Sequence, residues 1–320
     1  MYKIVIDLYY NTIMVKTLVL YVFHEYNWRV KRFVEKAIFY DENVDFMVIC
    51  NNTHFRLELP FYVKYFVREN IGFDFGGWSE ALFAEDTYKK YDYYIFANSS
   101  VVGPFIPSYC KEKWTDIYIN GLQDNVKLFG SSINTKPFER LHVQSYIFSM
   151  DKHTLQYLID CEIFSVHNYP KTFWEAVFQK EVLMSRKILD NGWNIGSLMP
   201  QYKNVDFTFT SKTPSECGIQ FLGDIMFNEH KGVLWNENDV VFVKGTRSID
   251  IIGVPYDKQD PINVSCRFSI KDSLKGNPNF FSSNTGPLTA NTSSLKRNPQ
   301  PLKKKHMFVL NMNKHNQQRR

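Results

Sequence analysis

The sequence contains few cysteines and no closely spaced pair of them. Cys50, Cys110, Cys161, Cys217 and Cys266 are far apart and odd in number, and no Cys-x-x-Cys motif occurs. A disulfide framework needs paired cysteines and a zinc site needs closely spaced ligands. The sequence therefore predicts reduced thiols, with neither a disulfide framework nor a zinc site.

The sequence also lacks a long uninterrupted apolar run. Residues 4–22 are rather apolar, but Asp7, Asn11 and Lys16 interrupt them. A membrane-spanning helix needs about 20 mainly apolar residues, and a cleavable signal needs a basic start and a small-residue cleavage site. We expect strands here and no stable membrane insertion.

Four Asn-x-Ser/Thr sequons begin at Asn51, Asn98, Asn263 and Asn291. The first two lie at the expected ends of strands, where a glycan would block folding or ligand binding. This position favours a cytoplasmic location.

Acidic residues are scarce in the last part of the chain. From Arg267 to Arg320 there are eleven Lys or Arg and one acidic residue, Asp272, so this part carries +10. The whole chain carries +5, which leaves −5 for residues 1–266. Because residues 267–320 are also rich in Asn, Ser and Pro, we predict a basic disordered tail. The acidic remainder makes nucleic acid an unlikely partner for the protein as a whole.

Elsewhere the sequence alternates apolar runs with helical patterns. Buried strands are predicted at 18–23, 45–50, 63–67 and 91–97, and a helix follows the N-cap Asn27. Further strands are expected at 126–134 and 142–151, and helices at 153–159 and 173–190. This pattern predicts an α/β fold, with a mostly parallel central sheet and helices on both faces.

Polar residues follow four of the predicted strands: His24-Glu25, Asn51-Asn52, Arg68-Glu69-Asn70 and Asn98-Ser99-Ser100. In open α/β sheets, ligands bind in the crevice at the carboxyl ends of the strands. The four strand ends therefore predict a ligand crevice along one edge of the sheet.

The most informative stretch runs from Asn70 to Trp78 and contains Gly72, Gly76 and Gly77, which permit tight turns. It leads into a helix that we expect to begin near Trp78. Asp74 has two interpretations, which the sequence leaves open. It is either a helix N-cap or a carboxylate that accepts hydrogen bonds from a ribose or sugar hydroxyl.

These residues resemble a known family. RENIGFDFGGW and YDYYIFANSSVVGPFIP look like segments of GT-A glycosyltransferases related to bacterial rhamnan-synthesis proteins, with similar proteins in algae, protists and large viruses. VKLFGSSIN, HVQSYIFSMD, FWEAVFQKEVLMSRKILDNGWNIGSLMPQY and VVFVKGTRS continue the resemblance in the same order. It implies a Rossmann-related GT-A-like fold and transfer of a hexose, deoxyhexose or pentose from a nucleotide-sugar donor to a glycan hydroxyl.

The resemblance sets the domain boundaries. We expect an N-terminal extension at 1–16, the GT-A-like domain at 17–250, a connecting segment at 251–266 and the basic disordered tail at 267–320.

The resemblance also implies a donor site. Its residues would be His24, Glu25, Asn51, Asn52, Asn70, Asp74, Asn98, Ser99 and Ser100. The last three fall where many GT-A enzymes carry the Asp-x-Asp motif that holds Mn²⁺ or Mg²⁺ against the diphosphate. That motif is absent here, so a requirement for a divalent cation stays open.

For the catalytic base of an inverting transfer, the resemblance implies Glu181 on the helix at 173–190, with Glu175 as the other carboxylate there. The alternative for Glu181 is an exposed residue that pairs with Arg186 or Lys187. His142, Gln144 and Trp174 would contact the acceptor or the sugar. A lone His on a strand and a Trp are, however, more often structural.

Two other functions remain open. The missing Asp-x-Asp would also suit a catalytically degenerate protein that binds nucleotide sugars or glycans. The basic stretch KRNPQPLKKK would suit a protein that uses its tail to bind RNA or an anionic membrane.

Overall fold

The computed structural model describes residues 15–247 and 249–251. The chain divides into two units, residues 1–269 and 270–320, and only the first contains described residues. The predicted extension at 1–16, the connecting segment and the tail lie almost wholly outside the described residues. Within them, no helix is long and apolar enough to span a membrane.

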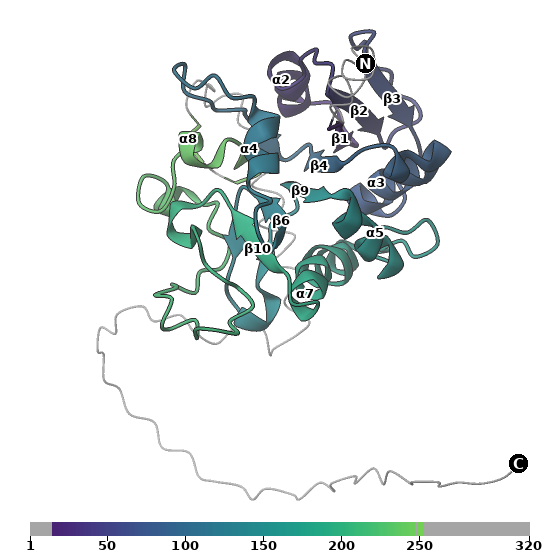
Figure 1. The fold of residues 1–320 in the computed structure, drawn as a ribbon. Coiled ribbons are helices and arrows are strands. Elements are labelled where there is room, and N and C mark those ends of the chain that lie inside the picture. The colour runs from purple at the N-terminus through teal and green to yellow at the C-terminus, as the bar shows by residue number, and fades with distance from the viewer. Residues whose placement is uncertain (1–14, 248, 252–320) are drawn as a thin grey trace, which may run out of the picture. The chain divides into compact units, whose positions relative to one another are not determined.

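The first unit alternates strands and helices along the chain (Figure 1). In order these elements are β1 (Thr17–Phe23), α2 (Trp28–Lys36), β2 (Val44–Cys50), β3 (Val63–Val67), α3 (Phe73–Phe83), β4 (Tyr93–Asn98), β5 (Val101–Val102), α4 (Trp114–Asn120), β6 (Val126–Gly130), β7 (Ile133–Asn134), β8 (His142–Val143), β9 (Ile147–Asp151), α5 (Lys152–Asp160), α6 (Phe173–Glu175), a π-helical segment (Ala176–Val182), α7 (Leu183–Asp190), β10 (Asn194–Ser197), α8 (Glu237–Val240) and β11 (Val243–Lys244).

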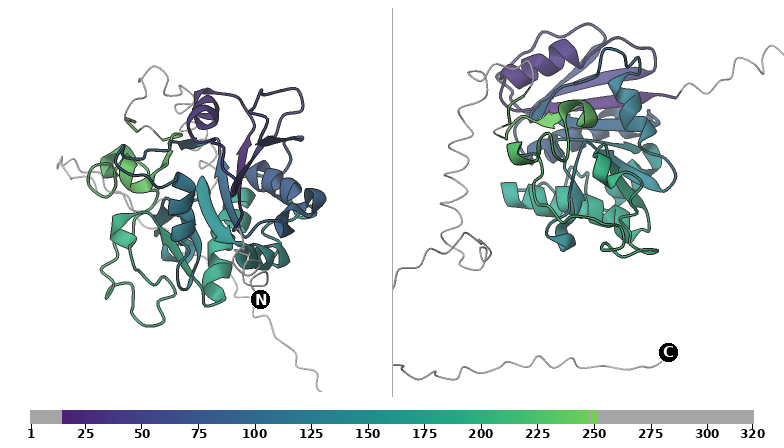
Figure 2. Two further views of the ribbon diagram at one scale, coloured as in Figure 1. Left: turned by 45° about the horizontal axis from the view of Figure 1, so that its top comes forward. Right: turned by 90° about the vertical axis from the view of Figure 1, so that its left-hand side faces the viewer.

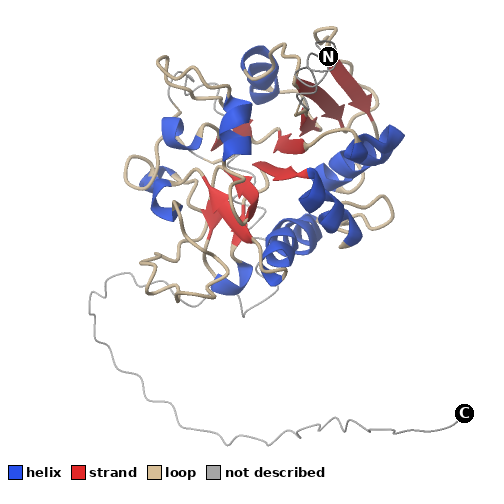
Figure 3. Ribbon diagram, viewed as in Figure 1, coloured by secondary structure: helices blue, strands red, loops and turns tan. Residues whose placement is uncertain are grey.

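The central sheet has seven strands in the order β10-β6-β9-β4-β1-β2-β3. Strands β3, β2, β1 and β4 are parallel, as are β6 and β10, whereas β9 is antiparallel to both β4 and β6. The predicted α/β fold with a mostly parallel sheet is thus confirmed (Figure 3).

Helices cover both faces of this sheet, as the two views in Figure 2 also show. One face carries α3, α5 and α7, and the other carries α2, α4 and α8. On the first face Trp78 packs edge-on against Phe96 and Phe148. On the second, Phe33 stacks on Tyr21 at 3.8 Å between ring centroids. All seven residues of β1 are buried, as its continuous apolar run predicts.

Helix α3 begins five residues before the predicted start near Trp78. Gly76 and Gly77, which we expected in a turn, lie inside the helix. A Cβ atom on Gly77 would lie 2.8 Å from both Asn51 Oδ1 and Val22 Cγ2. Gly77 therefore lets the first turns of α3 lie directly on the ends of β1 and β2, and that packing outweighs its low helix propensity.

Three other expectations need correction. The segment 126–134 forms two strands, β6 and β7, which belong to different sheets. The segment 142–151 is likewise split into β8, in a two-stranded sheet with β7, and β9 in the central sheet. The helix predicted at 173–190 has the expected length, but Ala176–Val182 are π-helical.

Candidate functional site

The first turn of α3 carries Asp74 to the carboxyl edge of the sheet. Gly72 precedes the helix with φ 77°, and a Cβ atom there would lie 2.8 Å from the ring of Tyr169. Only glycine combines this left-handed backbone with so close an approach. No side chain caps the helix. Asp74 therefore lies inside the first turn, and its interpretation as an N-cap is wrong.

The side chain of Asp74 contacts the end of β4 instead. Asn98 Nδ2 donates a hydrogen bond of 2.9 Å to Asp74 Oδ2, while Asn98 Oδ1 accepts one from the backbone N–H of Ser100. Burial raises the pKa of Asp74 to about 6. The hydrogen bond from Asn98 opposes that increase, the negative charge of Glu181 adds to it, and the positive charge of Lys244 opposes it.

Glu181 lies in the π-helical segment that precedes α7. Such segments add a residue to a helical turn and are frequent at functional sites. The Glu181 side chain is only 12% exposed. Its Oε1 accepts a hydrogen bond of 2.8 Å from the backbone N–H of Ser145 and lies 3.9 Å from His142 Nε2. Because these contacts turn it towards the sheet, pairing with Arg186 or Lys187 is not its role. Arg186 pairs with Asp190 instead.

A third carboxylate, Asp224, is held by polar contacts on both oxygens. Arg247 donates from Nε to Asp224 Oδ2 at 2.7 Å and also from Nη2. Gln144 Nε2 donates to Asp224 Oδ1 at 3.1 Å. Burial disfavours the charged form of Asp224, but the positive charges of Lys244 and Arg247 outweigh it and lower the pKa of this carboxyl.

Lys244 adds a positive charge that interacts with these carboxylates. It ends the short strand β11, which pairs antiparallel with β5 so that Lys244 lies opposite Val101. Its Nζ is 6.0 Å from the centroid of the Tyr146 ring. Burial, followed by the charge of Arg247, lowers the pKa of Lys244, and the carboxylates of Asp224, Glu181 and Asp74 oppose that decrease.

We call this group the charge cluster. It consists of Asp74, Asn98, Glu181, Asp224, Lys244 and Arg247. Among residues 15–247 and 249–251, no three His, Cys, Asp or Glu side chains converge as the ligands of a metal ion. The side chains in place of Asp-x-Asp, Asn98, Ser99 and Ser100, offer only neutral oxygens. These residues therefore do not fit a preformed site for a divalent cation.

Among the predicted donor residues, Asn51 joins the end of β2 to α3. Its Nδ2 donates to the carbonyl of Phe73 at 3.2 Å, and its Oδ1 accepts from Arg68 Nη1 at 3.1 Å. His24 Nδ1 is hydrogen-bonded to the carbonyl of Asn51 at 2.8 Å. The structure thus brings His24 and Asn51 together at the expected edge, with both amide atoms of Asn51 already engaged.

The other predicted donor residues are less enclosed. Glu25 is exposed, and Asn52 accepts a hydrogen bond from the backbone N–H of His54. Ser99 and Ser100 are partly buried, and their carbonyls accept hydrogen bonds from Arg29 Nε and from Gly245 N–H respectively. Within the described part of the chain, none of these four side chains bonds to the charge cluster, whereas the backbone N–H of Ser100 donates to Asn98 Oδ1.

Of the predicted acceptor residues, His142 and Gln144 adjoin the charge cluster and Trp174 does not. His142 lies beside Glu181, and Gln144 binds Asp224. Trp174 is 45% exposed and stacks on Phe178 near the start of the helix, with ring centroids 5.5 Å apart. It lies on an outer aromatic surface of this helix.

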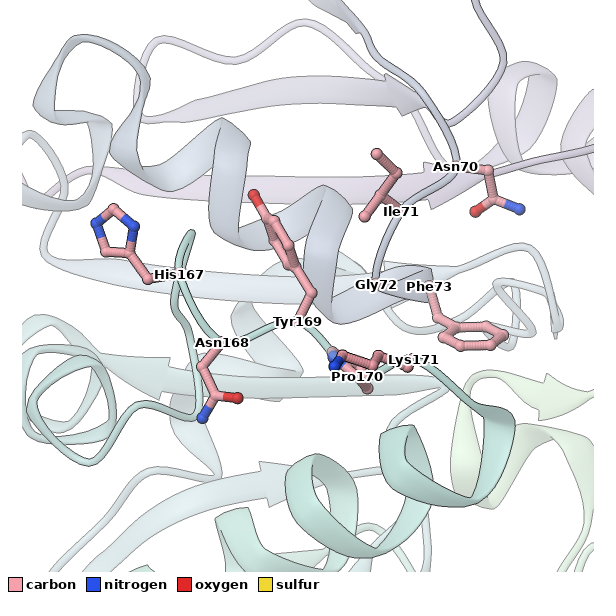
Figure 4. Close-up of a pocket in the computed structure, with 9 residues that line it drawn as sticks. All are labelled: Asn70, Ile71, Gly72, Phe73, His167, Asn168, Tyr169, Pro170 and Lys171. Atoms are coloured by element: carbon pink, nitrogen blue, oxygen red, sulfur yellow. The ribbon is translucent and has the colours of Figure 1, made fainter.

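A pocket of about 630 Å³ opens beside the first turn of α3 (Figure 4). Its walls are residues 70–73, which lead into α3, and residues 167–171, which lead towards α6. Asn70, an expected donor residue, is exposed here. Because Asp74 directly follows this wall, the pocket adjoins the charge cluster along the chain.

The comparison with known families identifies the family of this chain. The model of a family described as rhamnan synthesis protein F matches residues 47–224, more than half of the chain. The chain belongs to the rhamnan synthesis protein F family. The family is one of glycan synthesis, so the chain is related to transferases that build polysaccharides. No curated protein matches the chain.

The part that matches the rhamnan synthesis protein F family includes Asp74, Asn98, Glu181 and Asp224. Sequence reasoning missed Asp224, Lys244 and Arg247 as site residues. The VVFVKGTRS segment contains the two cations, and its place in the resemblance was a signal for them. Asp224 lies outside any helix or strand, and no pattern marks it.

Proposed function

We propose that this protein is an inverting glycosyltransferase with a GT-A-like fold. It transfers a sugar from a nucleotide-sugar donor to a hydroxyl of a glycan acceptor. The observation that carries the proposal is the charge cluster, in which Asp74 is bound to Asn98 at the carboxyl end of β4 and interacts electrostatically with Glu181 and Lys244. This edge is where α/β folds bind nucleotides. Among the sugars considered, the family's description favours a deoxyhexose, because a rhamnan is a polymer of one.

In this proposal Glu181 is the base. Its Oε1 is fixed by the backbone N–H of Ser145, and its Oε2 has no hydrogen bond among the described residues. Oε2 can therefore take the proton of the acceptor hydroxyl. The acceptor oxygen forms a bond to the anomeric carbon as the bond from that carbon to the diphosphate breaks. The electron pair of the broken bond leaves with the diphosphate.

On the donor side, the partly buried Asp74 is placed to accept hydrogen bonds from a ribose or sugar hydroxyl. Two observations support this role: burial of the carboxylate beside Lys244, and the neighbouring pocket at residues 70–73. His24, Glu25, Asn51 and Asn52 remain predicted contacts of the nucleotide.

The test is a thermal-shift panel of nucleotide sugars on the full chain, with and without Mn²⁺, followed by assays of donor hydrolysis and of transfer. A ligand that binds only the folded state raises the melting temperature. We expect at least one donor to stabilise the protein and to be turned over. A donor that binds without hydrolysis or transfer would favour the degenerate binding protein. A panel without any effect would contradict the proposal.

A further inference from the structure

The charge cluster contains a cation without a bonding partner. Arg247 is committed to Asp224 through two N–H groups. For Lys244, in contrast, the described residues provide no hydrogen bond and no ion pair. Asp74, Glu181 and Asp224 all influence it electrostatically, yet none is close enough to bind it. The side chain is partly buried, and its ammonium group has three donors that are open to a ligand.

The backbone places Lys244 beside the position that Asp-x-Asp would occupy. Lys244 pairs with Val101, three residues after Asn98, and the N–H of the following Gly245 donates to the carbonyl of Ser100 at 2.7 Å. A Cβ atom on Gly245 would lie 2.3 Å from Val102 Cγ2, so this approach of β11 to β5 depends on a glycine. The stem of Lys244 is thereby fixed at the end of β4.

We propose that the Lys244 ammonium binds the diphosphate of the donor. This inference rests on the proposed glycosyl transfer. Lys244 supplies the positive charge at the position where other enzymes hold a metal ion, and it stabilises the negative charge that develops on the departing diphosphate. The centroid of the Tyr146 ring lies 6.0 Å from Nζ, at the outer limit of a cation–π contact, so the ring flanks the ammonium. A compact ammonium on a flexible stem is suited to phosphate oxygens.

The experiment compares Lys244→Met, Lys244→Arg and a control, Lys36→Met. Lys36 is exposed at the last residue of α2, the end of that helix away from the carboxyl edge of the sheet. Calorimetry would measure binding of UDP, GDP, dTDP and the matching nucleosides, with excess EDTA present. Turnover would be measured with the donor identified by the panel.

For Lys244→Met we expect about a 10- to 100-fold loss of affinity for the nucleoside diphosphate, with unchanged affinity for the nucleoside. Turnover should fall by about 100- to 1,000-fold. Lys244→Arg should retain most of the diphosphate affinity because it keeps the charge, and Lys36→Met should match the unaltered protein.

Equal diphosphate affinity in Lys244→Met and the unaltered protein would overturn this inference and leave the glycosyltransferase proposal standing. An equal loss in Lys244→Met and Lys244→Arg would also overturn it, because charge would not be the cause. So would EDTA abolishing binding in the unaltered protein, since a metal ion would then hold the diphosphate. If the unaltered protein binds no nucleoside diphosphate even with Mn²⁺, both proposals fail.

Discussion

Glu181 and Glu175 lie on one continuous helical stretch but in different surroundings. Glu181 is buried, with Oε1 held by Ser145, whereas Glu175 Oε2 accepts a hydrogen bond from the backbone N–H of Lys171 at the start of the helix. Only Glu181 adjoins His142 and the charge cluster. The two residues therefore form a matched pair for testing which carboxylate is the base.

We predict that Glu181→Gln lowers turnover by about 100- to 10,000-fold, the usual effect of losing a general base. Glutamine keeps the shape and can still accept the N–H of Ser145, so donor affinity should barely change. Glu175→Gln should keep normal turnover. Steady-state kinetics and donor titrations on both variants provide the measurement. The reverse pattern would assign the base to Glu175, and normal turnover in both would place it elsewhere.

The burial of Asp74 couples its protonation to the stability of the fold. Its pKa is about 6 in the folded protein against an ordinary value of 3.8. Folding therefore favours its protonated form. The stability that this provides is fully present below about pH 4 and is lost as the pH rises through about 6, by up to about 3 kcal/mol.

We predict that Asp74→Asn melts at a higher temperature than the unaltered protein at about pH 7.5, with a difference that shrinks towards about pH 4. The variant should also bind the donor about tenfold more weakly or worse, because an amide cannot replace the carboxylate as an acceptor of two hydroxyl bonds. Thermal unfolding over a pH series and donor titration test both parts. Asp116→Asn, in the first turn of α4, is the matched control. A variant that melts lower at every pH but binds donor normally would show that Asp74 only stabilises the helix.

For individual residues, the sequence predicts where a polar side chain lies better than it predicts which contacts that side chain makes. Polar residues after apolar strands correctly indicated the edge where His24, Asn51 and Asn98 lie. The hydrogen bonds that commit Asn51 to Phe73 and Arg68 join residues 17 to 22 positions apart, and no local pattern encodes such contacts. Lys244 was overlooked for the same reason, since its position in the charge cluster depends on pairing with Val101 far along the chain.

At the scale of elements, α3 shows how packing sets a boundary that propensity does not. The sequence predicts a turn where Gly76 and Gly77 stand, because glycine is unfavourable inside helices. The structure continues the helix through them, because only glycine at the position of Gly77 allows α3 to touch Asn51 and Val22. The buried strands, by contrast, were predicted to within two residues at each end. A strand that is buried on both faces is a continuous apolar run in the sequence, so the ends of the run indicate the ends of the strand.

We predict that Gly77→Ala destabilises the protein by about 1–3 kcal/mol, the usual cost of overpacking. The added Cβ would lie 2.8 Å from Asn51 Oδ1 and Val22 Cγ2, so α3 must move away from the sheet. That movement shifts Asp74, and donor affinity should fall with stability. Gly223→Ala, where a Cβ atom would have open space, is the control. Chemical denaturation of both variants gives the comparison, and equal stabilities would show that α3 is not held this closely.

The π-helical segment is a second feature that periodicity does not reveal. The apolar pattern of residues 173–190 fits a single helix, and the length of that helix was predicted correctly. A π-helical turn changes the direction of the residues that follow it without changing the composition of the helix. Ala176–Val182 therefore set the direction of Glu181, and that direction places the side chain against Ser145 rather than in solvent.

At the scale of the whole molecule, charge is divided between two parts of the chain. Residues 1–266 carry −5 and residues 267–320 carry +10. The charge cluster has three carboxylates and two cations, so the site itself is slightly acidic before a donor binds. A diphosphate adds negative charge to it, which makes the contribution of Lys244 to binding larger than that of an isolated surface lysine.

The basic segment lies outside the described residues, and its independence from the site is our last prediction. The known members of the charge cluster end at Arg247, and the composition of residues 267–320 offers little apolar surface to bury. We therefore expect a chain of residues 1–266 to keep the melting temperature, donor affinity and turnover of the full chain. Insolubility or loss of transfer in the shorter chain would show that the basic segment supports the domain. RNA affinity that depends strongly on salt and disappears with the segment would assign it a separate binding role, because such dependence reports the release of counterions from phosphates.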